Sequence, residues 1–279
     1  MCDRCRVLEG VAALLIDLDG VLYVEDAPVA GAVQAVDSLR RGGLKLRFVT
    51  NTTARSRQRT LDKLAGLGLA VEDRELVTPA ALAVAHCRQR GLRRVALIMN
   101  DEVKRDFGGL EEVGEGGGGA EGGEGGEGGG GAEAVIVGDL GPAFGYDVLN
   151  RAFRLVMDGA ELIALQKNRY WLRADGLSLD VGPFVAAIEF ATGRDAYVVG
   201  KPAAGFFDQA LADLGVEAGA AAIVGDDIES DIGGGLRAGL AAILVRTGKY
   251  REEQVRASGI KPTVVVDSIA DVPALLLGG

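Results

Sequence analysis

The chain has 279 residues with a formal net charge of −10, and 48% of its residues are hydrophobic, enough to fill a sizeable core in one large domain or two modest ones. No apolar run approaches the ~18 residues of a membrane-spanning helix, and the short, charged N-terminus lacks the apolar region of a secretory signal, so we expect a cytoplasmic protein without a membrane partner. Nucleic acid is also excluded as a partner, because phosphate contacts need clustered Lys and Arg residues and none cluster here.

Cys2 and Cys5, near the N-terminus, have the spacing of a metal-binding or redox pair. The chain has no second pair, and His86 is its only histidine, so one chain cannot assemble a four-ligand zinc site. We therefore favour reduced thiols over a functional pair. His86 lies in an apolar helical stretch with no nucleophile motif beside it, which argues against Ser-His or Cys-His catalysis.

Residues 11–16 predict a buried parallel strand, because the run is short, continuously apolar and closed by a turn signal. Asp17, Asp19 and Gly20 follow at its carboxyl end, which is where open parallel sheets bind ligands. The glycine allows backbone N–H groups to approach an anion. An ordinary Asp-Gly turn is the alternative, and the motifs further along the chain make it less favoured.

The chain continues with a helix, a strand and a second helix, at residues 31–41, 44–49 and 55–67. Alternation of strands and helices at these lengths implies parallel strands with right-handed crossovers. Thr50 and Asn51, which follow the second strand, should therefore lie at the same sheet edge as Asp17. A hydroxyl and an amide beside carboxylates suit phosphate oxygens, whereas the alternative is a helix N-cap.

Residues 78–196 repeat the pattern of helices and strands, and strands needed to complete the first sheet come only after them. We interpret this block as an α/β domain inserted into a core domain formed by residues 1–77 and 197–279. Within the insert, residues 114–131 are almost entirely Gly and Glu. This composition predicts a disordered loop, since phosphate-binding glycine loops are short and lead into a helix.

After the insert, two apolar strands each deliver charge at their carboxyl end. The first, from Tyr197, ends at Lys201, and the second, residues 220–225, ends at Asp226 and Asp227. Gly200-Lys201-Pro202 lacks the other residues of a Walker P-loop. Asp231 faces the same site as Asp226 if a helix begins between them.

These strand ends bring acids and one lysine together. Asp17, Asp19, Asp226 and Asp231 would repel one another strongly unless a cation neutralised them. An oxygen-rich site without histidine favours a hard divalent ion, and Mg²⁺ above others because it leaves positions open for water and phosphate. Lys201 would offset the charge of a phosphoryl group.

The motifs Asp17-x-Asp19-Gly20, Thr50, Lys201 and Gly225-Asp226-Asp227 with Asp231 resemble, in order and context, those of haloacid dehalogenase superfamily phosphatases. The resemblance runs nearly end to end and implies an α/β fold: a doubly wound, Rossmann-like parallel-sheet core with an inserted smaller α/β cap of the C2 type. Animal members of the most similar group carry Ser at the position of Asp19, so this chain has the acid usual in working phosphatases. The Gly/Glu tract is not part of the family pattern.

The resemblance also implies roles for these residues. Asp17 would attack phosphorus to form an aspartyl-phosphate, and Asp19 would act as general acid and base. Asp17, Asp226 and the Asp19 backbone carbonyl would hold Mg²⁺. Thr50, Asn51 and Lys201 would bind the phosphate, together with the two aspartates of the first motif. Asp227 and Asp231 would surround these groups, with Asp231 orienting Lys201 or a metal-bound water.

Three functions are compatible with this set. The favoured one is an Mg²⁺-dependent phosphatase acting on a small phosphomonoester, phosphoramidate or pyrophosphate. A phosphotransferase or mutase would use the same intermediate, and a non-enzymatic phospho-acceptor switch of the receiver type is disfavoured because receivers lack a large insert. Relatives form dimers through the cap, which favours a homodimer.

Substrate selection is expected from a cap cluster of cations and aromatics: Lys167, Arg169, Tyr170 and Trp171. One or more of these residues would face the substrate. The alternative is a solvated hairpin with Trp171 packed on the cap.

Overall fold

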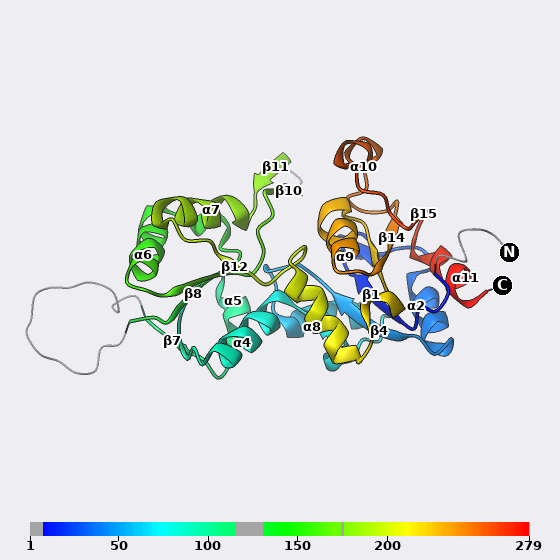
Figure 1. Cartoon of the computed structure of the whole chain (residues 1–279), viewed down its shortest axis with the longest axis horizontal. Coiled ribbons are helices and arrows are strands. Elements are labelled where there is room, and N and C mark those ends of the chain that lie inside the picture. The colour runs from blue at the N-terminus through cyan, green and yellow to red at the C-terminus, as the bar shows by residue number, and fades with distance from the viewer. Residues whose placement is uncertain (1–7, 115–130, 174–175, 279) are drawn as a thin grey trace, which may run out of the picture. The chain divides into compact units, whose positions relative to one another are not determined.

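A computed structural model describes residues 8–114, 131–173 and 176–278 (Figure 1). The described residues fall into two compact units, one from Met1–Thr50, Gln58–Thr78 and Lys201–Gly279, the other from Asn51–Arg57 and Pro79–Gly200. We call them the core unit and the cap unit. Cys2, Cys5 and all but the first and last residues of the Gly/Glu tract 114–131 lie outside the described residues, so the expectations for them stay untested.

The core unit is built on a six-stranded sheet in which every neighbouring pair is parallel. The strands, in their order across the sheet, are β15 (Val264–Val266), β14 (Ala241–Val245), β13 (Ala221–Gly225), β1 (Ala13–Asp17), β4 (Lys45–Val49) and β5 (Leu76–Val77). Strands β1 and β13 are buried along their whole length, which explains why their sequences, up to Asp17 at the end of β1, are continuously apolar instead of alternating.

Helices cover both faces of this sheet. Leu14 and Ile16 of β1 pack in one cluster with residues of α2 (Ala32–Arg41), α3 (Arg57–Gly66) and α11 (Val272–Leu277). On β13, Ile223 contacts Gly235 of α9 (Gly234–Arg237), and that helix also packs on Phe207 of α8 (Ala204–Leu214). Helix α10 (Glu252–Ser258) and the two-stranded ribbon β2 (Tyr23–Val24) with β3 (Ala27–Pro28) complete the unit.

The strand order reverses at β1. From β1 the chain adds β4 and β5 on one side, and much later β13, β14 and β15 on the other. Ile16 lies beside Val224 in the parallel register, so Asp17 and Asp226 leave neighbouring strands at nearly the same level. The point where strand order reverses, at the carboxyl ends, is where doubly wound sheets bind ligands.

The cap unit has a parallel sheet of its own. Its strands, in order, are β12 (Tyr197–Val198), β9 (Glu161–Ala164), β8 (Ala134–Val137), β6 (Arg94–Ile98) and β7 (Glu111–Glu112). Helix α4 (Pro79–Arg90) packs in the cluster on one face, and α6 (Tyr146–Met157) and α7 (Val181–Thr192) pack in the cluster on the other. Helix α5 (Asp101–Lys104) and an antiparallel hairpin, β10 (Tyr170–Arg173) with β11 (Gly176–Leu179), complete it.

One strand belongs to a different sheet than we expected. The run from Tyr197 is apolar and follows the insert, which predicts a strand of the first sheet. The structure pairs β12 with β9 of the cap unit instead, and Val198 packs in the cap cluster with Val135 and Ile188. The sequence of a short apolar strand does not indicate which of two sheets it joins. Its place depends on which neighbouring strand it can pair with. None of the described helices is both long and apolar enough to cross a membrane.

Shortening a side chain at the centre of the core sheet should destabilise the protein. Leu14 is 0% exposed and lies between β13 and β4. Leu14→Ala should lower the free energy of unfolding in urea by about 2–5 kcal/mol, from lost burial and the cavity left behind. Leu177→Ala is the control, because that side chain is 71% exposed and its loss should cost less than about 0.5 kcal/mol. Equal losses would contradict this assignment of the core.

Candidate active site

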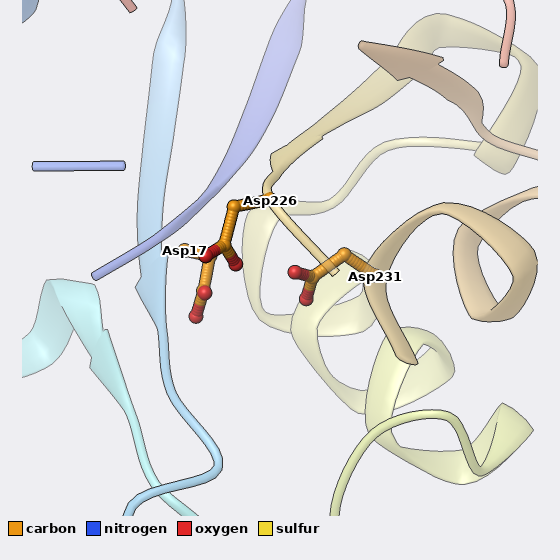
Figure 2. A group of neighbouring side chains, drawn as sticks. All are labelled: Asp17, Asp226 and Asp231. Carbon is orange, nitrogen blue, oxygen red and sulfur yellow. The ribbon is translucent and has the colours of Figure 1, made fainter. Parts of the chain in front are cut away.

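Three buried carboxylates meet at the carboxyl edge of the core sheet. Asp17 is the last residue of β1, Asp226 follows β13, and Asp231 lies on the next turn of chain. One oxygen from each lies within 4.8 Å of the others (Figure 2). Thr50 is buried at the end of β4, one residue beyond Val49, which pairs with Asp17.

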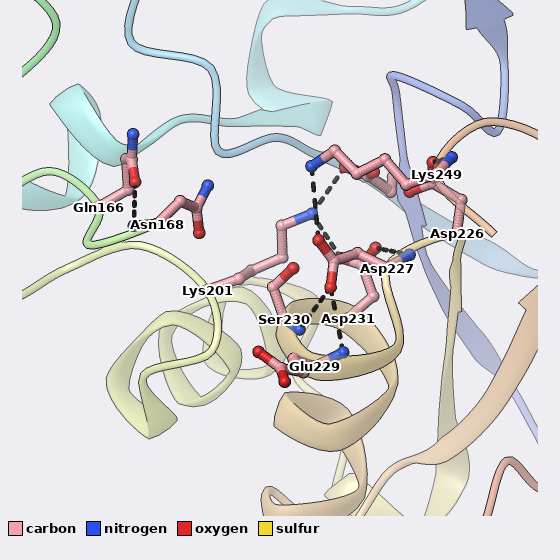
Figure 3. Close-up of polar contacts among 10 residues, drawn as sticks. Gln166, Asn168, Lys201, Asp226, Asp227, Glu229, Ser230, Asp231 and Lys249 are labelled. Atoms are coloured by element: carbon pink, nitrogen blue, oxygen red, sulfur yellow. Dashed lines mark hydrogen bonds and ion pairs between the residues drawn. The ribbon is translucent and has the colours of Figure 1, made fainter. Parts of the chain in front are cut away.

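Lys201 joins two of these carboxylates. Its Nζ donates to Oδ1 of Asp17 and to Oδ1 of Asp231, both at 2.6 Å, and the side chain is 2% exposed. Figure 3 shows Lys201 beside Asp231. Burial alone would lower the pKa of Lys201, but the charges of Asp17 and Asp231 outweigh burial and raise it. The lysine is therefore held as a cation between two acids.

Asp226 has one satisfied oxygen and one unsatisfied oxygen. Its Oδ2 accepts a 2.7 Å hydrogen bond from the Lys249 backbone N–H, whereas its buried Oδ1 has no partner among the described residues. Burial, with the charges of Asp17 and Asp231, raises the pKa of Asp226 well above its ordinary value. Three carboxylates against one ammonium leave two excess negative charges if all are ionised, and an orphaned buried carboxylate oxygen beside them fits a divalent cation.

Asp227 and Asp231 organise the segment after β13. Asp227 Oδ1 accepts from the backbone N–H groups of Glu229 and Ser230, both at 3.0 Å, and so caps a π-helical turn, Ile228–Gly233. Asp231 Oδ2 accepts from the Asp227 N–H at 3.2 Å, which aims its Oδ1 at Lys201. Turns of this type are frequent at functional sites. A Cβ on Gly225 would lie 2.5 Å from Asp231 Cγ, so that position needs glycine.

The second aspartate of the first motif has a different partner. Asp19 is half-buried, and its Oδ2 accepts from the Tyr23 hydroxyl at 3.2 Å. Tyr23 is itself buried beside the Lys63 ammonium, which lies 4.2 Å from the ring centroid. Among the described residues, Asp19 is not one of the three acids whose oxygens lie within 4.8 Å of one another.

The remaining predicted residues belong to the cap unit. Asn51 is grouped there, where its Oδ1 packs against Gly200. Lys167 pairs with Glu189. Tyr170 and Trp171 are 50% and 44% exposed, and Trp171 lines a cap cavity of about 380 Å³ together with Phe144, Leu179, Asp180 and Phe184, among others. Contact of Asn51 or of the Lys167–Trp171 cluster with substrate stays a prediction.

Sequence reasoning assigned no site role to Lys249. Its backbone holds Asp226, and its ammonium lies 3.4 Å from Asp227 Oδ2. Burial would lower the pKa of Lys249, but Asp227 and the three buried acids raise it. The signal was present, because Thr247-Gly248-Lys249 is a polar segment just after the buried strand β14, the same pattern that marks Asp17 and Asp226.

Comparison with known proteins gives the family. A model for haloacid dehalogenase-like hydrolases matches residues 14–111, and a second model for such hydrolases matches residues 198–272. A human protein named phospholysine phosphohistidine inorganic pyrophosphate phosphatase is 38% identical over 276 residues, covering 97% of this chain and 96% of that protein. The chain belongs to the haloacid dehalogenase-like hydrolase family.

Other members of this family are similarly related. Human haloacid dehalogenase-like hydrolase domain-containing protein 2 is 39% identical over 264 residues, covering 95% of this chain and 94% of that protein. The p-nitrophenyl phosphatase of Archaeoglobus fulgidus superposes with a TM-score of 0.84 at 28% identity, covering 94% of this chain and 98% of that one. The family, the α/β core with an added cap and the enzyme class predicted from the motifs, a phosphatase of this superfamily, are confirmed.

Removing Lys201 should destabilise the metal-free protein in a pH-dependent way. Burial raises the pKa of Asp17, and raises that of Asp231 to about 7. The folded protein therefore holds more protons than the unfolded chain between roughly pH 4 and 7, and its stability falls as pH rises through that range. Lys201→Met should raise both pKa values further. We expect a loss of roughly 3–5 kcal/mol in unfolding free energy at pH 8 and much less at pH 5.

Urea unfolding in EDTA at both pH values measures this effect. Lys261→Met, at an exposed position of the core unit, is the control and should be neutral at both. An equal loss for Lys201→Met at the two pH values would show that the lysine does not offset these carboxylates.

Proposed function

We propose that the protein is an Mg²⁺-dependent phosphatase that works through an aspartyl-phosphate on Asp17. The observation that carries the proposal is the Lys201 ammonium bonded to Asp17 beside an unpartnered Asp226 oxygen. This arrangement supplies a nucleophile, a fixed cation for a phosphoryl group and an oxygen free for a metal ion.

The chain's own residues divide the reaction into two displacements. An Asp17 oxygen forms a bond to phosphorus as the bond to the leaving oxygen breaks, and Asp19 gives its proton to that oxygen. Asp19 then takes a proton from water, which attacks phosphorus, releases phosphate and restores Asp17. Lys201 and Thr50, with Asn51, hold the phosphoryl oxygens, and Asp231 keeps Lys201 in place.

The metal would be held by Asp17, Asp226 and the Asp19 backbone carbonyl. When bound, Mg²⁺ supplies charge neutralisation and orientation of the phosphoryl oxygens. The unpartnered Asp226 Oδ1 and the excess of carboxylates over lysine support this assignment.

The substrate class is a small molecule with a phosphomonoester, phosphoramidate or pyrophosphate bond. One human relative is named for phospholysine, phosphohistidine and inorganic pyrophosphate, and structural neighbours are nitrophenyl phosphatases. A phosphate-release screen over ~100 phosphorylated compounds with Mg²⁺ tests the proposal, because specificity is expressed in relative kcat/KM. Transfer of phosphate to an added alcohol, without release to water, would assign a phosphotransferase instead.

Asp17→Asn should abolish phosphate release from every substrate, because an amide cannot form the acyl-phosphate bond. Acid-quenched wild-type protein should yield a phosphorylated peptide containing Asp17, and the variant should not. EDTA should also abolish release, and added Mg²⁺ should restore it. Undiminished turnover by Asp17→Asn would refute the nucleophile assignment.

Asp19→Asn should lower kcat by about 10²–10⁴-fold for alkyl phosphates, whose leaving oxygen needs a proton. For p-nitrophenyl phosphate the first displacement should be much less affected, since nitrophenolate leaves without protonation. Burst kinetics separate that step from hydrolysis of the intermediate. An equal loss in the first step for both leaving groups would remove the general-acid role from Asp19.

A further inference from the structure

The segment after β14 holds Asp226 in one orientation. The Lys249 N–H donates to Asp226 Oδ2, and Gly248, at φ 63°, lies against the same oxygen. A Cβ on Gly248 would be 2.1 Å from that oxygen, and a Cβ on Gly20 would be 1.9 Å from it. Two glycines from distant parts of the chain therefore enclose one carboxylate oxygen, and no larger residue fits at either position.

The two glycines are also fixed to each other. The Thr247 hydroxyl donates to the Gly20 backbone carbonyl. The Gly20 Cα lies only 2.4 Å from the place a Gly248 Cβ would take. The segment 247–249 is thus fixed to the turn that carries Asp17 and Asp19. Direct contacts therefore hold the proposed metal ligands Asp17 and Asp226, which come from separate strands, in place relative to each other.

We propose that residues 247–249 are a positioning element for the metal site. They occupy Oδ2 of Asp226 and thereby present its other oxygen to the cation, the buried Oδ1 that has no partner in the described part of the chain. Replacing a group that orients a metal ligand typically lowers metal affinity or activity by about 10–100-fold. The inference rests on the proposed Mg²⁺ function, and it adds a role that the catalytic motifs do not include.

A matched pair of glycine variants tests the enclosure. Gly248 and Gly259 have nearly the same positive φ, 63° and 67°, but among the described residues nothing lies within 4 Å of a Cβ on Gly259. Alanine therefore meets a similarly unfavourable φ at both positions, and only at Gly248 does it also displace the Asp226 carboxylate. Mg²⁺ is titrated calorimetrically into the EDTA-stripped full chain. We expect Gly248→Ala to bind Mg²⁺ about 10–100-fold more weakly than Gly259→Ala.

A second pair tests the tether and serves if Gly248→Ala does not fold. Thr247→Val removes the hydroxyl donor to Gly20, and Thr247→Ser keeps it. We expect about a tenfold loss of Mg²⁺ affinity for the valine variant and less than about a twofold change for serine. Raising Mg²⁺ should restore kcat of Thr247→Val toward wild type, which a general loss of structure would not allow.

The outcomes separate the two proposals. Circular dichroism first shows that Gly248→Ala and Thr247→Val are folded. If wild type binds Mg²⁺ and these two variants bind it as tightly as their controls, Gly259→Ala and Thr247→Ser, the positioning role is overturned and the phosphatase proposal stands. If the wild-type chain takes up no Mg²⁺ in the calorimeter, the proposed metal dependence fails and this inference fails with it.

Discussion

The site depends on one buried cation between two buried acids. Asp17 and Asp231 are removed from water, and Lys201 is the ammonium that bonds to both. A buried charge is tolerated only when an opposite charge pairs with it. One ammonium between two carboxylates leaves an excess negative charge, which attracts a further cation. Under the proposed function, the same imbalance that would destabilise an isolated site would favour a divalent cation and, with it, a phosphoryl group.

The sheet topology determines which residues take part. Because β1 lies where strand order reverses, the ends of β1 and β13 bring Asp17 and Asp226 together in the space where doubly wound sheets bind ligands. The loop after β14 then closes on that space through Gly248. In each case a buried apolar strand is followed in the sequence by a loop with polar groups. The apolar residues therefore specify the core, and the polar residues that follow them specify the site.

Much of this was predictable from the sequence because the elements are long and strongly apolar. The strand ending at Asp17 and the helix Pro79–Arg90 follow from composition and turn residues alone. The sheet that β12 joins could not be predicted, because the two residues of this strand do not indicate which strand they pair with. The place of Lys249, just after a buried strand, marks it as a site residue, but its contact with Asp226 comes from a backbone N–H, which every residue has, so the residue type does not reveal that role.

The way the chain passes between its units bears on how the protein is made. Ala13 lies beside Ala221 in the finished sheet, while the whole cap unit is encoded between them. During translation, all strands of the cap sheet leave the ribosome before β13 does, so the cap sheet is complete in the nascent chain first. Until then the edge of β1 that later pairs with β13, apolar from Ala13 to Ile16, is unpaired and open to wrong partners. Inserting one domain within another thus lengthens the time for which this edge is exposed during synthesis.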